Sequence, residues 1–142
     1  MTPPTDDMLL VTRLDELVEV VQALDATAYV RFSAGPDVDR GSPSVDGESG
    51  ATLPGLSVNR LTPEPWWTRP AREWMARQVC QYAHLGGGER YAWVLTGTEV
   101  GRGPDSEPLV DDVVPVARLG QTALDEATGV YHRAMAPGNL PG

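Results

Sequence analysis

The feature that most constrains the fold is a pair of long stretches near the C-terminal end that are joined by a short turn. Residues 91–100 and 109–119 are rich in β-branched and apolar side chains, and Gly-Arg-Gly-Pro-Asp at 101–105 separates them. Strands joined by so short a link pair antiparallel, because a parallel connection needs a crossover of about a dozen residues. The sequence therefore predicts a long hairpin, with an interruption at Pro115, which donates no ladder hydrogen bond.

The remaining elements follow from hydrophobic periodicity. Apolar residues at helical spacing predict helices over 12–24, 70–85 and 122–135. Alternating and apolar stretches predict strands over 28–33 and 53–59. Because strands and helices do not alternate regularly, this order favours a single α+β domain. Its sheet is expected to be mostly antiparallel and twisted, with about three helices flanking it.

The boundaries of this domain follow from the segments that lack periodicity. Residues 1–11 are expected to be a flexible lead-in, residues 12–136 the domain, and residues 137–142 a disordered tail. Thr12-x-x-Asp15 predicts a capping box at the first helix. The stretch 35–52 is rich in Gly, Ser, Pro and Asp, which predicts a long loop, and such loops are usually functional or disordered.

Composition excludes several functions. The chain has 11 Arg, no Lys and 20 Asp plus Glu, giving a net charge of −9, which disfavours nucleic acid and anionic membranes as partners. Absence of Lys excludes Walker-A phosphate binding and Schiff-base catalysis. No apolar run is long enough to span a membrane, the N-terminus is not a secretory signal, and Cys80 is the sole cysteine. We therefore expect a cytoplasmic protein; its oligomeric state is not determined by the sequence.

Three polar side chains share one face of the strand at 28–33. Alternation places Arg31 beside Tyr29 and Ser33. An arginine on a sheet can simply face solvent, but it is also well suited to bind an anion bidentately. These three residues are the candidate cofactor-binding residues of the strand, and the implied ligand is a small anion.

Three further residues are candidates for catalysis. Ser57 lies between apolar neighbours, where it either fills a small core site or hydrogen-bonds a ligand; it lacks the second glycine of a nucleophile elbow. Asp105 and Glu107 are two positions apart, so they share a side of an extended segment. Two such carboxylates either face water or divide the work of stabilising an oxocarbenium-like transition state.

Two aromatic residues and a Cys–His pair complete the candidates. Trp66 and Trp67 lie in the arginine-rich stretch 60–77, where indole faces and guanidinium groups can hold a planar anion. The alternative is that the tryptophans pack inward while the arginines extend into solvent. Cys80 and His84 share one helix face, but two ligands do not define a metal site, and none is predicted.

Several segments of the chain resemble a family of uncharacterised bacterial proteins, chiefly actinobacterial. The resemblance covers most of residues 14–119 and implies no activity, because the family is a domain of unknown function. The segments that carry it are Tyr-Val-Arg-Phe-Ser-Ala-Gly-Pro at 29–36, Leu-Pro-Gly-Leu-Ser-Val-Asn at 53–59, Glu-Pro-Trp-Trp-Thr-Arg-Pro at 64–70, and the stretch 93–110.

The order of three residues is also similar to the Arg–Ser–Glu pattern of ADP-ribosyltransferases. The resemblance implies that fold, NAD as co-substrate, and Arg31 on the NAD phosphates. It further implies Ser57 beside the nicotinamide ribose and Glu107 on the ribose 2′-hydroxyl. Asp105 stands where the family often has Gln or Glu. The chain departs from the pattern in Leu-Ser-Val around the serine and in Pro108 after the glutamate.

Two functions follow as expectations. The first is an NAD-dependent ADP-ribosyltransferase-like enzyme or NAD glycohydrolase, which requires the arginine, serine and glutamate of this pattern to converge in one cleft. The alternative is a non-catalytic module that binds a small anionic ligand or a protein partner through Trp66, Trp67 and the loop at 35–52. A small enzyme with a mainly apolar pocket is a third reading.

Overall fold

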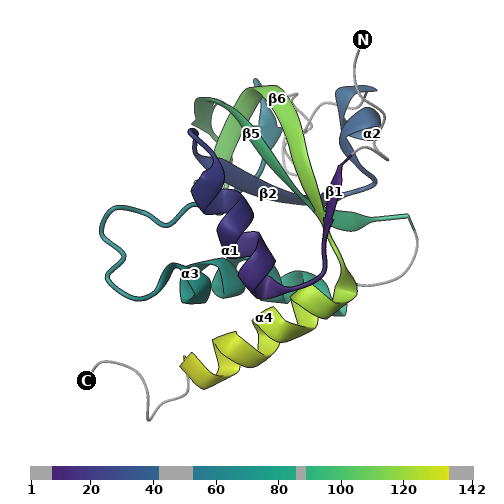
Figure 1. Ribbon diagram of the computed structural model, residues 1–142. Coiled ribbons are helices and arrows are strands. Elements are labelled where there is room, and N and C mark those ends of the chain that lie inside the picture. The colour runs from purple at the N-terminus through teal and green to yellow at the C-terminus, as the bar shows by residue number, and fades with distance from the viewer. Residues whose placement is uncertain (1–7, 42–52, 86–88, 135–142) are drawn as a thin grey trace.

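A long antiparallel hairpin forms the centre of the sheet in the computed structural model, which describes residues 8–41, 53–85 and 89–134 (Figure 1). Strands β5 (Tyr91–Arg102) and β6 (Pro108–Leu119) make this hairpin, which confirms the prediction. The expected break at Pro115 is wrong. Pro115 pairs with Leu95 next to a register shift, and the strand continues past it because a bulge accommodates the missing donor.

Two further strands flank the hairpin. β2 (Ala28–Ser33) pairs antiparallel with β5 along its whole length, as predicted. β1 (Leu9–Val11) pairs parallel with the end of β6, so the expected flexible lead-in ends in a strand of the sheet. Three residues are too few for alternation to be recognised in the sequence.

The stretch expected to form one strand at 53–59 instead forms two very short ones. β3 (Leu56–Ser57) pairs with β6, whereas β4 (Asn59–Arg60) pairs with β2. The strand order is β1-β6-β5-β2-β4, with β3 pairing β6 beside this path. Five consecutive residues therefore connect two edges of the same sheet.

Three helices cover one face of the sheet, in agreement with the predicted α+β class (Figure 1). They are α1 (Leu14–Ala23), α3 (Ala71–Val79) and α4 (Gln121–Ala134), and a 3₁₀ segment, η2 (Cys80–His84), extends α3. None of the helices in the described parts of the chain is long and apolar enough to cross a membrane. A short helix, α2 (Pro36–Gly41), begins the stretch that was expected to be a loop.

The predicted capping box at the start of α1 is not formed. Arg13 is the N-cap residue, and it makes no side-chain cap. Thr12 donates its hydroxyl hydrogen bond to Glu16 Oε1 instead, at 3.0 Å. The helix is held by its buried stripe of Leu14, Leu17 and Val21, so packing rather than the cap defines it.

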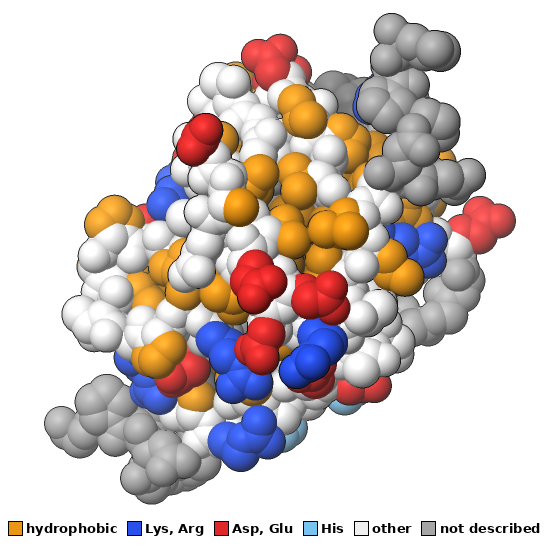
Figure 2. Space-filling model, viewed as in Figure 1, with side chains coloured by type: hydrophobic (Ala, Val, Ile, Leu, Met, Phe, Trp, Pro, Cys, Tyr) orange, Lys and Arg blue, Asp and Glu red, His pale blue; other side chains and the backbone are white. Residues whose placement is uncertain are grey.

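The sheet buries apolar side chains on both faces, because successive strand residues point to opposite sides. In β2, Val30 belongs to the large cluster beneath the helices, and Tyr29 belongs to a smaller cluster on the other face with Trp93 and Leu95. On the surface, charged side chains of both signs gather below a hydrophobic area on the face seen in Figure 2. The second cluster requires a cover, which Leu56 and Val58 help to provide.

Candidate functional site

A groove of about 630 Å³ opens where β4 leaves the edge of β2. β4 pairs with β2 only at Tyr29 and Val30. The residues just before β4 form β3, which pairs with β6 instead. Within the described residues, the edge of β2 beyond Val30 therefore has no strand partner. Four of the residues singled out in the sequence line this one groove, although they come from different segments: Arg31, Ser57, Asp105 and Glu107.

The groove is basic, in contrast to the chain as a whole. Four arginines line it against three carboxylates, while the chain carries a net charge of −9. The lining thus has a small excess of positive charge, which attracts anions to the arginine head groups. The charged lining residues are Arg31, Arg60, Arg90, Arg102, Glu64, Asp105 and Glu107.

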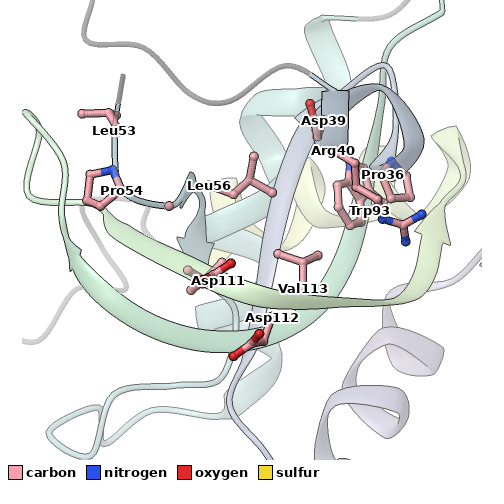
Figure 3. Close-up of a pocket in the computed structure, with 12 residues that line it drawn as sticks. Pro36, Asp39, Arg40, Leu53, Pro54, Leu56, Trp93, Asp111, Asp112 and Val113 are labelled. Atoms are coloured by element: carbon pink, nitrogen blue, oxygen red, sulfur yellow. The ribbon is translucent and has the colours of Figure 1, made fainter. Parts of the chain in front are cut away.

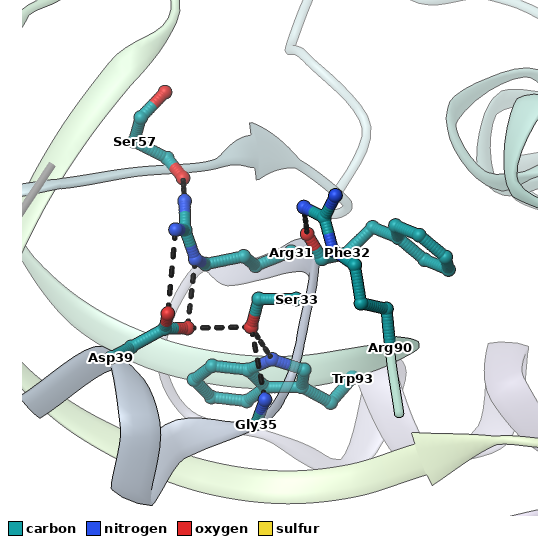
Figure 4. Close-up of polar contacts among 8 residues, drawn as sticks. All are labelled: Arg31, Phe32, Ser33, Gly35, Asp39, Ser57, Arg90 and Trp93. Atoms are coloured by element: carbon teal, nitrogen blue, oxygen red, sulfur yellow. Dashed lines mark hydrogen bonds and ion pairs between the residues drawn. The ribbon is translucent and has the colours of Figure 1, made fainter. Parts of the chain in front are cut away.

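Arg31 is held by its own neighbours rather than presented to a ligand (Figure 4). Its Nε and Nη2 donate to the Asp39 carboxylate at 2.8 and 3.4 Å, and its Nη1 donates to the Ser57 carbonyl oxygen at 2.7 Å. The Asp39 side chain is only 8 % exposed. Arg31 thus joins β2, α2 and β3, and each nitrogen of its guanidinium group already has a protein partner.

Ser33 and Tyr29, the other candidates on β2, do not line the groove. Ser33 is buried, donates to Asp39 at 2.6 Å, and accepts from the Trp93 indole at 3.0 Å and the Gly35 amide at 3.1 Å. Tyr29 is also buried, and its hydroxyl donates to Glu99 at 3.3 Å. Burial, together with the Glu99 carboxylate, raises the pKa of Tyr29. Both residues stabilise the sheet around the groove.

The turn between β5 and β6 fixes the Glu107 side chain. The Gly103 amide donates to the Glu107 carbonyl at 2.8 Å, and Glu107 Oε1 accepts from the Asp105 amide at 3.3 Å. This carboxylate lies so close to Gly103 that any Cβ there would overlap it. Gly103 is thus required for the approach of Glu107, and Asp105 is exposed beside it.

An aromatic pair forms one wall of the groove. Phe32 and Tyr82 stack with ring centroids 5.3 Å apart, and the Arg90 guanidinium lies 5.3 Å from the Phe32 centroid. Tyr82 accepts a hydrogen bond from Asn59 Nδ2 at 2.8 Å. Burial raises the pKa of Tyr82, which favours the neutral phenol in this wall.

Arg90 and Arg102 are groove residues that the sequence reasoning missed. Arg90 Nη2 donates to the Phe32 carbonyl at 3.2 Å. Arg102 Nη1 donates to the Ser106 carbonyl at 3.1 Å, and its Nη2 pairs with Glu99 at 2.9 Å. Arg90 directly precedes a predicted strand and Arg102 lies in the predicted turn at 101–105, but nothing in the local sequence distinguishes either from a solvent-facing arginine.

Trp66 and Trp67 lie outside the groove, in an edge-to-face cluster with Trp74 whose centroids are 5.2 to 6.2 Å apart. Trp74 is buried, and its Nε1 donates to the Arg60 carbonyl at 3.3 Å. Trp66 is 65 % exposed. Residues 42–52 of the expected loop lie outside the described residues, so a partner surface formed by Trp66, Trp67 and that loop stays a prediction.

Cys80 and His84 show no arrangement for metal binding or nucleophilic catalysis. Cys80 is half-buried, and burial raises the pKa of its thiol, which leaves it protonated at neutral pH. His84 is exposed at the end of η2. In the described part of the chain, no group of three or more His, Cys, Asp or Glu residues is placed to hold a metal ion.

A smaller cavity of about 380 Å³ lies beside α2 (Figure 3). Its lining includes Leu56, Val113 and Asp39, and the buried Trp93 lies beneath it. None of the site residues proposed from the sequence lines this cavity. Because Asp39 lines it while Arg31 lines the groove, their ion pair forms part of the wall between the two.

The fold and this geometry define a small α+β domain with a basic recess at a sheet edge. The chain matches the family described as "Family of unknown function (DUF6098)" over residues 4–139, and it belongs to that family. Searches of curated proteins and of solved structures returned no match. The comparisons thus confirm a family of unknown function and lend no support to the similarity to ADP-ribosyltransferases.

Proposed function

We propose that the protein binds a small phosphate-bearing ligand in the basic groove. The observation that carries this proposal is the convergence of four arginines on one recess of a chain whose net charge is −9. Guanidinium groups match the geometry of phosphate oxygens and keep their charge at any physiological pH. A volume of about 630 Å³ also falls within the usual range of small-molecule sites.

The four arginines have two different roles in this proposal. Arg31 and Arg60 are held by carboxylates and backbone carbonyls, so part of their charge is offset and their main role is to form the wall of the groove. Arg90 and Arg102 are exposed, and each is oriented by one hydrogen bond to a carbonyl oxygen, while Arg102 also pairs with Glu99. These two side chains are the ones that contact the ligand phosphate.

Titration calorimetry with pyrophosphate and ADP-ribose tests this proposal. We expect saturable binding that weakens as salt rises, and Arg90→Gln or Arg102→Gln should each raise Kd about threefold to tenfold. Arg77→Gln is the matched control, because it removes the same charge from an exposed position on α3 that does not line the groove. No saturable binding, or an equal loss in the control, would overturn the proposal.

A second candidate is transfer or hydrolysis at the nicotinamide–ribose bond of NAD. It is favoured by the presence of Arg31, Ser57, Asp105 and Glu107 along one groove. In this mechanism the carboxylate of Glu107 stabilises the positive charge that develops on the ribose as nicotinamide leaves. Since Arg31 is occupied by Asp39, the pyrophosphate contact falls to the exposed arginines instead.

Nicotinamide release from NAD tests the second candidate. Glu107→Gln should reduce the rate at least a hundredfold, whereas Glu19→Gln, an exposed substitution on α1, should leave it unchanged. Absence of release, together with absence of an NAD-induced shift in Tm, would remove this candidate. The binding proposal would then depend on the other phosphate ligands alone.

A further inference from the structure

The two exposed arginines of the groove lie at opposite ends of one strand. Arg90 directly precedes β5, a strand of 12 residues, and Arg102 is its last residue. Such a strand spans at most about 40 Å, and twist and bulges shorten it. Three register shifts occur in the β5–β6 pairing. Both arginines line the same groove, so it receives a cationic side chain from each end of the strand.

Each of these guanidinium groups is oriented by a different part of the chain. Arg90 donates to the carbonyl of Phe32 and lies over its ring, whereas Arg102 donates to the carbonyl of Ser106 in the hairpin turn. A carbonyl partner fixes the direction of a guanidinium group without neutralising its charge. The two arginines therefore act as two anion contacts rather than as one clamp.

The surroundings of the two contacts differ in charge. Arg102 pairs with Glu99 at 2.9 Å, which offsets part of its charge. Among the described residues, Arg90 forms no ion pair with a carboxylate. Arg90 is therefore the stronger of the two contacts. Asp105 and Glu107 line the groove as well, and their repulsion disfavours an anion placed midway along it.

We infer that the ligand of this groove carries two phosphate groups joined by a spacer, one contacting Arg90 and the other contacting Arg102. This inference rests on the proposed function and specifies the ligand class. Two linked anionic groups gain affinity because the second contact becomes intramolecular once the first has formed. A ligand with a single phosphate reaches only one of the two arginines at a time.

A series of alkane bisphosphonates with two to twelve methylene groups tests the inference on the full-length chain, with methylphosphonate as the single-anion reference. We expect an optimum chain length, at which Kd is at least tenfold below that of methylphosphonate. Arg90→Gln or Arg102→Gln should each abolish most of this gain, with the larger loss for Arg90→Gln, and Arg77→Gln should preserve it. Circular dichroism and Tm would verify that each variant is folded.

The outcomes separate this inference from the proposal on which it rests. If methylphosphonate binds and the groove variants weaken it, but affinity does not depend on chain length, the two-contact ligand is wrong and the binding proposal stands. If the bisphosphonate gain survives in both variants, the inference is likewise overturned. If neither methylphosphonate nor any bisphosphonate binds, both the proposed function and this inference are wrong.

Discussion

Arg31 and Arg90 lie near the same residue, Phe32, and line the same groove, yet they occupy opposite physical situations. Arg31 directs every nitrogen of its guanidinium head to Asp39 or to the Ser57 carbonyl. Arg90 is exposed and directs one nitrogen to the Phe32 carbonyl. The difference teaches that burial and prior partners, not residue type, decide whether an arginine stabilises the fold or is available to a ligand.

The Arg31 region is a closed network in which each polar group depends on the others. Ser33 satisfies two donors and gives its own proton to Asp39, which also pairs with Arg31. Removing one member leaves the remaining groups buried without a partner, which costs more than the interaction itself contributes. The exposed arginines have water as a substitute. Substitutions in the closed network should therefore lower the free energy of unfolding much more than substitutions of the exposed arginines.

The largest effect is expected for Asp39→Asn. The change leaves the charge of Arg31 uncompensated in a mostly buried site, so the free energy of unfolding should fall by about 3 kcal/mol. Asp37→Asn is the control on the same helix, because Asp37 pairs with Arg40 at an exposed position, where a loss below about 1 kcal/mol is expected. Urea denaturation measures both. Equal losses of stability in the two variants would show that the ion pair of Asp39 is no more important to the fold than that of Asp37.

The second largest effect is expected for Gly35→Ala. Gly35 belongs to the closed network because its amide donates to the Ser33 hydroxyl. Gly35 has φ +116°, and a Cβ there would overlap the hydroxyl of Tyr91. Strain and overlap together should cost about 2 kcal/mol. Gly129→Ala, within α4, is the control and should stabilise by about 0.5–1 kcal/mol, because alanine favours helix. Thermal unfolding of the two variants should shift in opposite directions.

A smaller effect concerns the buried phenol in the wall of the groove. Because burial raises the pKa of Tyr82, the folded chain binds this proton more tightly than the unfolded chain does. Stability should therefore be intact below pH 10 and should fall as pH rises past that value. Tyr82→Phe should reduce the steepness of this alkaline loss, measured by urea denaturation between pH 8 and 11. An unchanged pH dependence would argue that Tyr82 ionises freely.

The smallest effect on stability is expected for Arg90→Gln. The side chain is exposed, so losing its carbonyl hydrogen bond and its contact with Phe32 should cost at most about 0.5 kcal/mol. The same variant should nevertheless weaken phosphate binding in calorimetry. A loss of stability as large as that of Asp39→Asn would show that Arg90, like Arg31, stabilises the fold.

The sequence predicts the parts of the fold that repeat a pattern. The hairpin of β5 and β6, the strand β2 and the three main helices all carry many turns or alternations, and they are found. Strands β1, β3 and β4 have two or three residues each, so their existence depends on partners distant in the sequence. The prediction at Pro115 was wrong because a bulge directly beside the proline lets the strand continue without its N–H donor.

The candidate site was predictable only in part. The convergence of Arg31, Ser57, Asp105 and Glu107 follows from how their strands pair, which the order of the elements allows but does not require. The ion pair between Arg31 and Asp39 could not be predicted, because Asp39 lies in α2, within a stretch whose composition predicts a loop. Nothing in the local sequence indicates such a tertiary partner.

The short segment 56–60 couples the opening of two edges of the sheet, because it pairs with β6 through β3 and with β2 through β4. A fluctuation that lifts this segment uncovers β6 at Leu109 and Val110 together with β2 at Tyr29 and Val30, since one segment covers both edges. Amide hydrogens along the two edges should therefore exchange with solvent as one cooperative unit. Because Ser57 and Asn59 also line the groove, a ligand seated there would slow exchange at both edges at once.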